Sequence, residues 1–215
     1  IADKVVSIFD QIPPQLSKHE KKFRLSALKP GAKYRDWYDA FFWLKDARVV
    51  NICYNSTEPN IGLKMNEDRT TLKCYMNDTG LLISHAFDEK SIVSSEIYQK
   101  LLFGKLEVNE GMLIENIVAQ MLTSSGNKLF FYSKSSDEAQ NRMEIDFLLQ
   151  KDKVTTRHNI RPIEVKSGKN YTLSSITKCM KKFGEYMTSP TVLHAADYKV
   201  EDGITYLPLY MTPLL

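Results

Sequence analysis

The chain has 215 residues, of which 43% are hydrophobic, and a formal net charge of +3. This size is enough for one large domain or two small ones with buried cores. It contains no apolar run near the roughly 18–20 residues that cross a bilayer and no secretory signal pattern, so we expect a cytoplasmic protein. The three cysteines and four histidines show no zinc-ligand spacing, which favours buried free thiols over a metal knuckle or a disulfide framework.

Basic residues are concentrated in two stretches of the chain. Residues 18–35 hold seven basic side chains against one acidic, and residues 151–185 hold nine against three. Both stretches suit binding to a nucleic-acid phosphate backbone. Runs of this kind are equally typical of solvated surfaces, so both interpretations stay open.

The first 50 residues have the pattern of three helices. The first begins so close to Ile1 that we expect the chain to be a piece of a longer protein, and Pro13-Pro14 is expected to interrupt this helix. A second helix is predicted over 16–28 and a third over 34–47. The predicted apolar stripe of the third helix consists of Tyr38, Phe41, Phe42 and Leu44, with Trp37 and Trp43 beside it.

Two strands, predicted over 49–54 and 71–76, follow these helices. Three helices and a two-stranded ribbon are typical of a winged-helix module, which we assign to 1–83, with a helical linker over 84–108. The third helix of such a module often reads the major groove of DNA. Here that helix carries three aspartates, which disfavour phosphate, so a packing role stays open beside DNA binding.

Residues 109–215 alternate between helices and strands. The predicted helices span 109–122 and 174–187, and the predicted extended segments span 129–132, 143–149, 161–166, 191–196 and 204–211. This order predicts an α/β domain with a mixed sheet flanked by helices. In the first helix, Glu115 lies in line with Val118, Ala119 and Leu122, so a carboxylate is expected on the apolar face.

The two central strands alternate polar and apolar residues with period two. On the first, Ile145, Phe147 and Leu149 are expected to oppose Glu144 and Asp146. On the second, Ile163 and Val165 are expected to oppose Glu164 and Lys166. If these strands pair with their polar faces aligned, Asp146, Glu164 and Lys166 converge. Such a cluster is costly unless a cation or a substrate occupies it, so it indicates a functional site.

Several segments of the chain resemble a known family. An aspartate followed by Glu-x-Lys resembles the motif of the restriction-endonuclease-like fold, PD-(D/E)xK, although Ile145 stands where that motif has proline. The amino-acid sequence of several segments is similar to the C-terminal region of prokaryotic AAA-family ATPases, in which a winged helix precedes a nuclease-like domain. The segments that carry this resemblance are 12–16, 75–82, 111–116, 144–147 and 163–168.

The resemblance implies roles for four residues. Asp146 and Glu164 would bind Mg²⁺ or Mn²⁺, Lys166 would orient or activate water, and Glu115 would hold a second ion or a water attached to the first. It also implies nucleic acid as partner, with DNA favoured, and a homo-oligomeric parent assembly. The ATPase domain itself is missing, because nothing matches Gly-x-x-x-x-Gly-Lys-Ser/Thr, so any ATP site would lie in that missing part.

Two main hypotheses about function follow. The first is a metal-dependent nuclease domain that acts on nucleic-acid phosphodiesters. The second is a catalytically idle module with a nuclease fold, which binds nucleic acid or a partner and regulates the ATPase. A winged-helix transcription regulator and a surface ion pair without function are the remaining alternatives.

Overall fold

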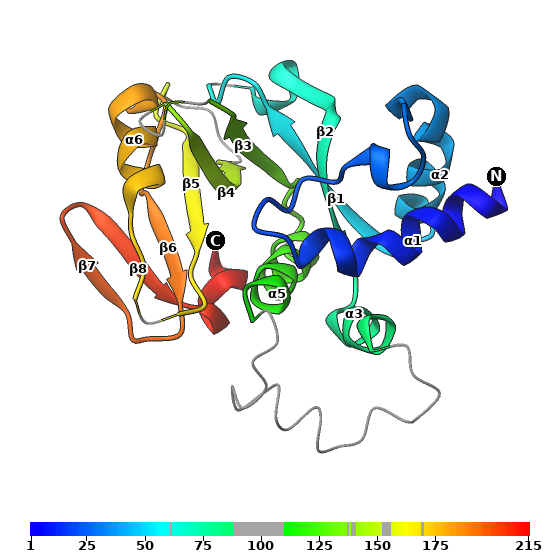
Figure 1. The fold of residues 1–215 in the computed structure, drawn as a ribbon. Helices are drawn as coiled ribbons and strands as arrows, with labels where there is room; N and C mark the ends of the chain where they lie inside the picture. Colours follow the sequence, from blue (N-terminus) through cyan, green and yellow to red (C-terminus); the bar gives the residue numbers. More distant parts are fainter. Residues whose placement is uncertain (61, 88–109, 137, 139–140, 152–155, 169) are drawn as a thin grey trace. The chain divides into compact units, whose positions relative to one another are not determined.

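The computed structural model describes residues 1–60, 62–87, 110–136, 138, 141–151, 156–168 and 170–215. It has the mixed α/β architecture that the sequence predicts, with N-terminal helices and an eight-stranded mixed sheet flanked by helices (Figure 1). The chain forms two compact units. Unit 1 comprises Ile1–Ile52 and Lys73–Gln120, and unit 2 comprises Cys53–Leu72 and Met121–Leu215.

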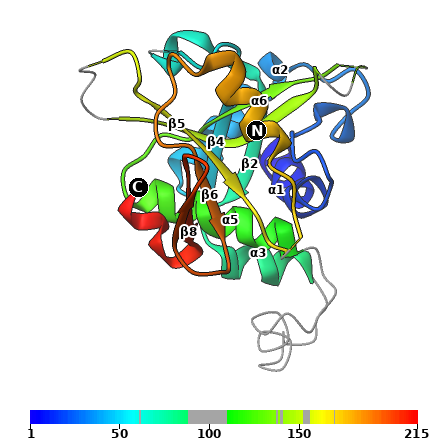
Figure 2. The ribbon, with the colours of Figure 1, turned by 90° about the vertical axis from the view of Figure 1, so that its left-hand side faces the viewer.

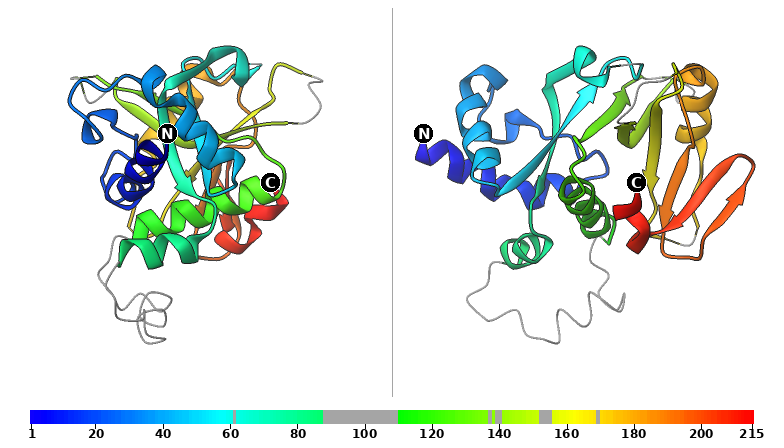
Figure 3. Two further views of the ribbon diagram at one scale, coloured as in Figure 1. Left: turned by 90° about the vertical axis from the view of Figure 1, so that its right-hand side faces the viewer. Right: turned by 180° about the vertical axis from the view of Figure 1, so that it is seen from behind.

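Unit 1 contains helices α1 (Ala2–Leu16), α2 (Tyr34–Asp46) and α3 (Thr79–Ala86), and most of α5 (Glu110–Ser124). Helix α1 packs against α2 and α3 (Figure 3). Helix α3 lies at the end of the module predicted over 1–83 and extends into the first residues of the predicted linker, up to Ala86. From residue 88 to 108, the predicted linker lies outside the described residues.

The predicted break at Pro13-Pro14 is wrong, because α1 continues through both prolines to Leu16. Pro13 has no N–H to offer the Phe9 carbonyl four residues before it. The His85 ring of α3 supplies the missing contact, with Nε2 3.2 Å from the Phe9 carbonyl oxygen. A tertiary hydrogen bond therefore satisfies the acceptor that proline leaves open, and the helix persists.

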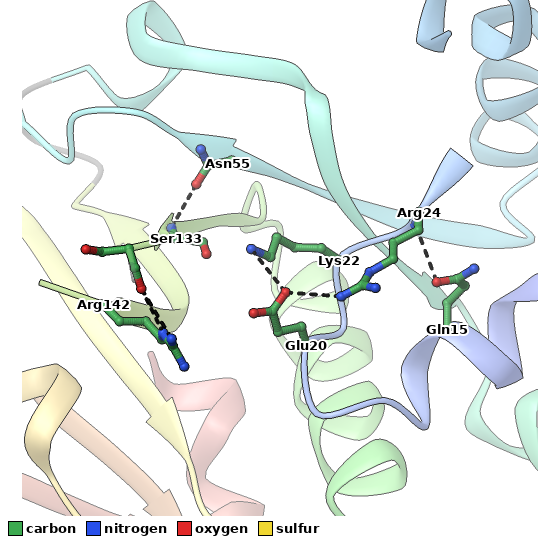
Figure 4. Close-up of polar contacts among 8 residues, drawn as sticks. Gln15, Glu20, Lys22, Arg24, Asn55, Ser133 and Arg142 are labelled. Carbon is green, nitrogen blue, oxygen red and sulfur yellow. Dashed lines mark hydrogen bonds and ion pairs between the residues drawn. The ribbon is translucent and has the colours of Figure 1, made fainter. Parts of the chain in front are cut away.

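The prediction of a second helix over 16–28 is also wrong. Only a single 3₁₀ turn, η1 (Leu25–Ala27), forms there. Side-chain contacts hold the segment before it: Gln15 Oε1 accepts from the Arg24 backbone N–H at 3.4 Å. Glu20 Oε2 lies 3.6 Å from Lys22 Nζ and 3.5 Å from Arg24 Nη2 (Figure 4). Two of the seven basic residues of the stretch 18–35, Lys22 and Arg24, thus share one carboxylate within the chain.

The third predicted helix is confirmed as α2, but its buried face differs from the prediction. The buried residues are Trp37, Ala40, Phe41 and Leu44. Trp37, Phe41 and Leu44 follow i, i+4 and i+7 spacing, which aligns them on one side of a helix. Tyr38 and Phe42 lie one position further round, are exposed, and stack with ring centroids 6.3 Å apart.

The sheet has the strand order β2-β1-β3-β4-β5-β6-β8-β7. The strands are β1 (Val50–Ser56), β2 (Glu67–Met76), β3 (Phe130–Lys134), β4 (Met143–Gln150), β5 (Ile160–Val165), β6 (Thr191–His194), β7 (Lys199–Glu201) and β8 (Ile204–Pro208). All predicted strands are confirmed within a few residues. The sequence analysis missed β7, a fully exposed strand of three residues with no apolar face to recognise. Beyond Pro208 the chain forms a 3₁₀ helix, η3 (Leu209–Leu214), next to β8 (Figure 2).

The two strands assigned by sequence to the N-terminal module also take part in this sheet. Within unit 2, Tyr54 and Asn55 of β1 pair in parallel with Phe130 and Phe131 of β3. The Asn55 side chain extends this pairing, because its Oδ1 accepts from the Ser133 backbone N–H at 2.9 Å (Figure 4). The ribbon is therefore part of a larger sheet, which the local pattern did not reveal.

Helix α6 (Ser174–Phe183) packs on β4 and β5 and buries Ile176 and Cys179. It ends earlier than the predicted residue 187. Met187 instead forms a parallel bridge to Ile160 and is buried there. Among the helices in the described ranges, none is both long enough and apolar enough to cross a membrane.

Candidate active site

Strand β4 has an irregular register at the position where the sequence places the functional aspartate. Phe130 of β3 pairs with Leu148, whereas Tyr132 pairs with Ile145, so two steps along β3 match three along β4. Both Ile145 and Leu148 consequently join the same core cluster. The strict alternation predicted for this strand is therefore wrong, because a bulge interrupts it. Bulges redirect the side chains beside them and are frequent next to active sites.

Asp146 lies at this bulge and contacts the neighbouring strand. Its Oδ2 accepts a hydrogen bond from the backbone N–H of Val165 at 2.9 Å. The register ends at the pair of Phe147 with Ile163, and one further step in the same direction would set Asp146 opposite Glu164. Residues opposite each other in such a pair have Cβ atoms about 4.5–5.5 Å apart. The hydrogen bond to Val165 shows that the Asp146 side chain reaches β5 next to the position of Glu164.

The Glu164 carboxylate is buried and only partly compensated. The residue is 2% exposed, and Lys166 Nζ lies 2.6 Å from its Oε2. This contact is an ion pair, and neither Glu164 oxygen receives an aligned hydrogen bond from the described residues. Cys179 of helix α6 is affected by the same carboxylate. Burial of the Cys179 thiol, and next the negative charge of Glu164, raise the pKa of this thiol to about 12. An ionised carboxylate held in this way is costly, which is expected of a site that awaits a ligand.

Lys166 lies close to a pair of side chains that the sequence analysis did not select. Its Nζ is 6.0 Å from the centre of the Tyr171 ring, within range of a cation–π contact. The Tyr171 hydroxyl is 3.2 Å from Nδ1 of His194, and Nε2 of His194 is 3.1 Å from the Asp197 carbonyl oxygen. Since a carbonyl only accepts, Nε2 carries the proton and Nδ1 accepts from Tyr171.

No sequence signal would have identified His194, because its partner lies 23 residues away. It stands at the end of β6, and the parallel pairing of Val165 with Leu193 brings the end of β6 beside the end of β5. Tyr171 follows the Glu-x-Lys motif closely in the chain, which is the one hint that the sequence offered.

Glu115, the fourth predicted site residue, belongs to unit 1 and has its own partners there. It is 2% exposed, as its position on the apolar face of the helix predicts. Its carboxylate contacts Lys21 Nζ, lies 3.1 Å from Lys73 Nζ, and accepts from the Tyr75 hydroxyl at 2.5 Å. Burial would raise the pKa of Glu115, but the charges of Lys73 and Lys21 outweigh it and hold the pKa at about 2.

In unit 2 the structure pairs Lys166 with Glu164 and sets Asp146 against the backbone N–H of Val165, the residue between them in the chain, whereas Glu115 has a buried ionic network in unit 1. Within the described ranges, no three His, Cys, Asp or Glu side chains form a group that could hold a metal ion. The pair of Asp146 and Glu164 still fits a magnesium site, because Mg²⁺ often takes only one or two protein carboxylates and completes its shell with water and phosphate oxygens. The Glu164 oxygens, which receive no aligned hydrogen bond from the described residues, are the observation that supports this fit.

Two ranges of the chain match known family models. Residues 110–211, which include all four predicted site residues, match a family described as "Domain of unknown function (DUF4143)". Residues 2–91 match a family described as "Domain of unknown function (DUF8612)". No curated protein and no solved structure matches the chain. Since neither family description names an activity, the functional argument depends on the chemistry of the site.

Proposed function

We propose that unit 2 is a nuclease domain that uses a divalent metal ion to hydrolyse nucleic-acid phosphodiesters. The observation that carries this proposal is the buried Glu164 carboxylate, which lies beside Lys166 and lacks an aligned hydrogen bond from the described residues. A protein gains no stability from a desolvated carboxylate whose hydrogen-bonding capacity is unfilled. Its presence is explained if a cation and a substrate complete the site.

Asp146 and Glu164 would hold the metal ion, because Mg²⁺ and Mn²⁺ prefer carboxylate oxygens. When bound, the ion supplies Lewis acidity, which polarises a phosphate oxygen and acidifies water. The Val165 N–H fixes one Asp146 oxygen, so the orientation of this carboxylate is set by the backbone of the neighbouring strand. The β4 bulge and the β5 register together position both carboxylates before a ligand arrives.

Lys166 would act on the substrate. Its ammonium group, now paired with Glu164, is 22% exposed at the side chain and can reach solvent. A cation at this position orients an attacking water and stabilises the negative charge that develops on a phosphoryl group. The Tyr171 ring limits where the Lys166 side chain can lie, and His194 holds the Tyr171 hydroxyl.

In this proposal the chain is the C-terminal part of an AAA-family ATPase, residues 1–83 form a winged-helix-like module, and ATP binds in the missing ATPase domain. DNA is the favoured substrate. These statements rest on the sequence resemblance described above, whereas the proposed cytoplasmic location rests on the sequence pattern.

The direct test is incubation of the purified chain with supercoiled plasmid, single-stranded DNA and RNA, each with Mg²⁺, Mn²⁺ or EDTA. We expect cleavage that requires metal and is lost in Glu164→Ala. The matched control is Glu185→Gln, because Glu185 is an exposed carboxylate of the same unit that pairs with Arg157 at 3.2 Å. Equal cleavage by the wild type and Glu164→Ala would refute the proposal.

One observation favours the alternative, a catalytically idle binding module. Lys166 already neutralises part of the Glu164 charge at 2.6 Å, so the site can exist without a metal ion. An idle module would bind nucleic acid equally well in EDTA and in Mg²⁺, and Glu164→Ala would not change that binding. Binding that requires both the metal ion and Glu164 would exclude this alternative.

A further inference from the structure

Unit 2 contains a cavity on a different part of the sheet from the candidate active site. Its volume is about 160 Å³. The residues that line it are Asn127, Leu149, Gln150, Lys151, Arg161 and Leu215. They come from the turn after α5, the end of β4, the start of β5 and the C-terminal segment. Leu149 and Arg161 are directly paired across the two strands, so the cavity is built on regular secondary structure.

The charged side chains that line this cavity are both basic. The lining contains two cationic side chains, two amides and no Asp or Glu side chain. An arginine offers five N–H donors, a lysine three, and each amide group two. Such a set suits an oxyanion that accepts hydrogen bonds from several directions.

Arg161 is a partly buried cation without a carboxylate partner in the described part of the chain. Its Nε is buried and has no hydrogen-bond partner there, and no Asp or Glu oxygen lies within the 4.0 Å that defines an ion pair. Burial lowers the pKa of the Arg161 guanidinium, since the charged form loses hydration. The buried Nε–H lacks an acceptor among the described residues, so an anionic ligand would supply one.

We propose that this cavity binds a phosphate group, held mainly by Arg161 and Lys151. Guanidinium groups match the geometry of phosphate oxygens, and an ammonium group adds a second charge. The Asn127 and Gln150 amides supply further donors, while Leu149 and Leu215 form the apolar part of the wall. This function goes beyond the proposed nuclease chemistry and does not depend on it.

The phosphate group has two potential sources, a free oxyanion or the backbone of a bound nucleic acid. Both use the same chemistry in the cavity. The volume of about 160 Å³ accommodates a phosphate group. A backbone phosphate would enter from a strand that runs across the surface, whereas a free phosphate would enter alone.

The test is a titration of the whole chain with inorganic phosphate in EDTA, followed through the ¹⁵N-labelled side-chain Nε–H signal of Arg161. We expect a saturable shift that equal ionic strengths of chloride do not produce. In Lys151→Gln, where an exposed side chain changes and the fold is not at risk, the affinity should fall about tenfold, the loss typical of one charged hydrogen bond. Arg161→Lys should weaken binding further. The control Lys181→Gln, an exposed lysine at the end of α6, should bind as the wild type does.

An Arg161 signal that phosphate does not move, or equal affinities in the wild type and Lys151→Gln, would overturn the proposal. A short single-stranded DNA added to the phosphate complex distinguishes the two sources. Displacement of phosphate at Arg161 assigns the cavity to a backbone phosphate, and retention assigns it to a free oxyanion. Because the titration contains no metal ion and measures no cleavage, a failure of the nuclease proposal would leave its result unaffected.

Discussion

Lys73 Nζ lies 3.1 Å from Glu115 Oε1, and both side chains are almost completely inaccessible to water. Lys21 and Tyr75 complete the coordination of the carboxylate. The two strongest candidate carboxylates of the chain thus differ in kind. Glu115 is buried and fully engaged, whereas Glu164 is buried and receives no aligned hydrogen bond from the described residues. The first arrangement is typical of a structural network, and the second is typical of a binding site.

Glu115→Gln should strongly destabilise the protein. Removing one member of a buried ion pair leaves an uncompensated charge and costs about 3–5 kcal/mol. Here two lysines would lose their common partner. Urea denaturation followed by circular dichroism would measure the loss in the free energy of unfolding. Glu110→Gln, at an exposed position in the first turn of the same helix, is the matched control and should change little. Equal stabilities for the two variants would show that the network contributes nothing to the fold.

The same network predicts how stability depends on pH. Glu115 has a folded-state pKa of about 2, against an ordinary value of 4.5. Since its pKa is lowered on folding, its contribution is present above about pH 4.5 and is lost as the pH falls towards 2. The free energy of unfolding should therefore fall across this window in the wild type, and less steeply in Glu115→Gln. Parallel curves for both proteins would contradict the assignment of this titration to Glu115.

Much of the fold could be predicted from the sequence, because its segments carry clear periodicity. The strands around Asp146 and Glu164 and the buried position of Glu115 follow from alternation and from helical spacing. The partners of Glu115 could not be predicted, since Lys21 and Lys73 lie 94 and 42 residues away in the chain. Only the tertiary fold brings such residues together.

The β4 bulge shows a second limit of sequence analysis. Alternation assigned Ile145 to the face opposite Asp146, together with Phe147 and Leu149, but the bulge places Ile145 in the same cluster as Leu148. Both arrangements bury apolar residues, so the pattern alone does not distinguish them. Register is set by pairing with β3, which is a property of the sheet and not of one strand. The sequence thus predicts where the site lies in the chain, but it does not predict the geometry of the site.

Glu164→Gln should leave stability unchanged or increase it, in contrast to Glu115→Gln. The substitution removes a desolvated charge, and the remaining Lys166 can turn to solvent because its side chain is 22% exposed. Residues that serve function often lower the stability of the fold, so replacing one of them by an uncharged residue leaves the free energy of unfolding unchanged or increases it. Urea denaturation at pH 7 of both variants beside the wild type would measure this difference. A loss of several kcal/mol in Glu164→Gln would instead identify Glu164 as part of a structural ion pair.

The hydrogen bond between Tyr171 and His194 should be detectable as a coupling energy. Tyr171→Phe retains the ring beside Lys166 but leaves the buried Nδ1 of His194 without its donor, which costs about 1–3 kcal/mol of stability. His194→Leu removes the acceptor, so the added effect of Tyr171→Phe in that background should be much smaller. The coupling energy follows from denaturation of the two single variants and the double variant. Tyr186→Phe, a partly buried tyrosine of the same unit, controls for the loss of a hydroxyl. If the effects of the two substitutions simply add, the hydroxyl does not bond to His194, and Tyr171 is not held in place beside Lys166 by this contact.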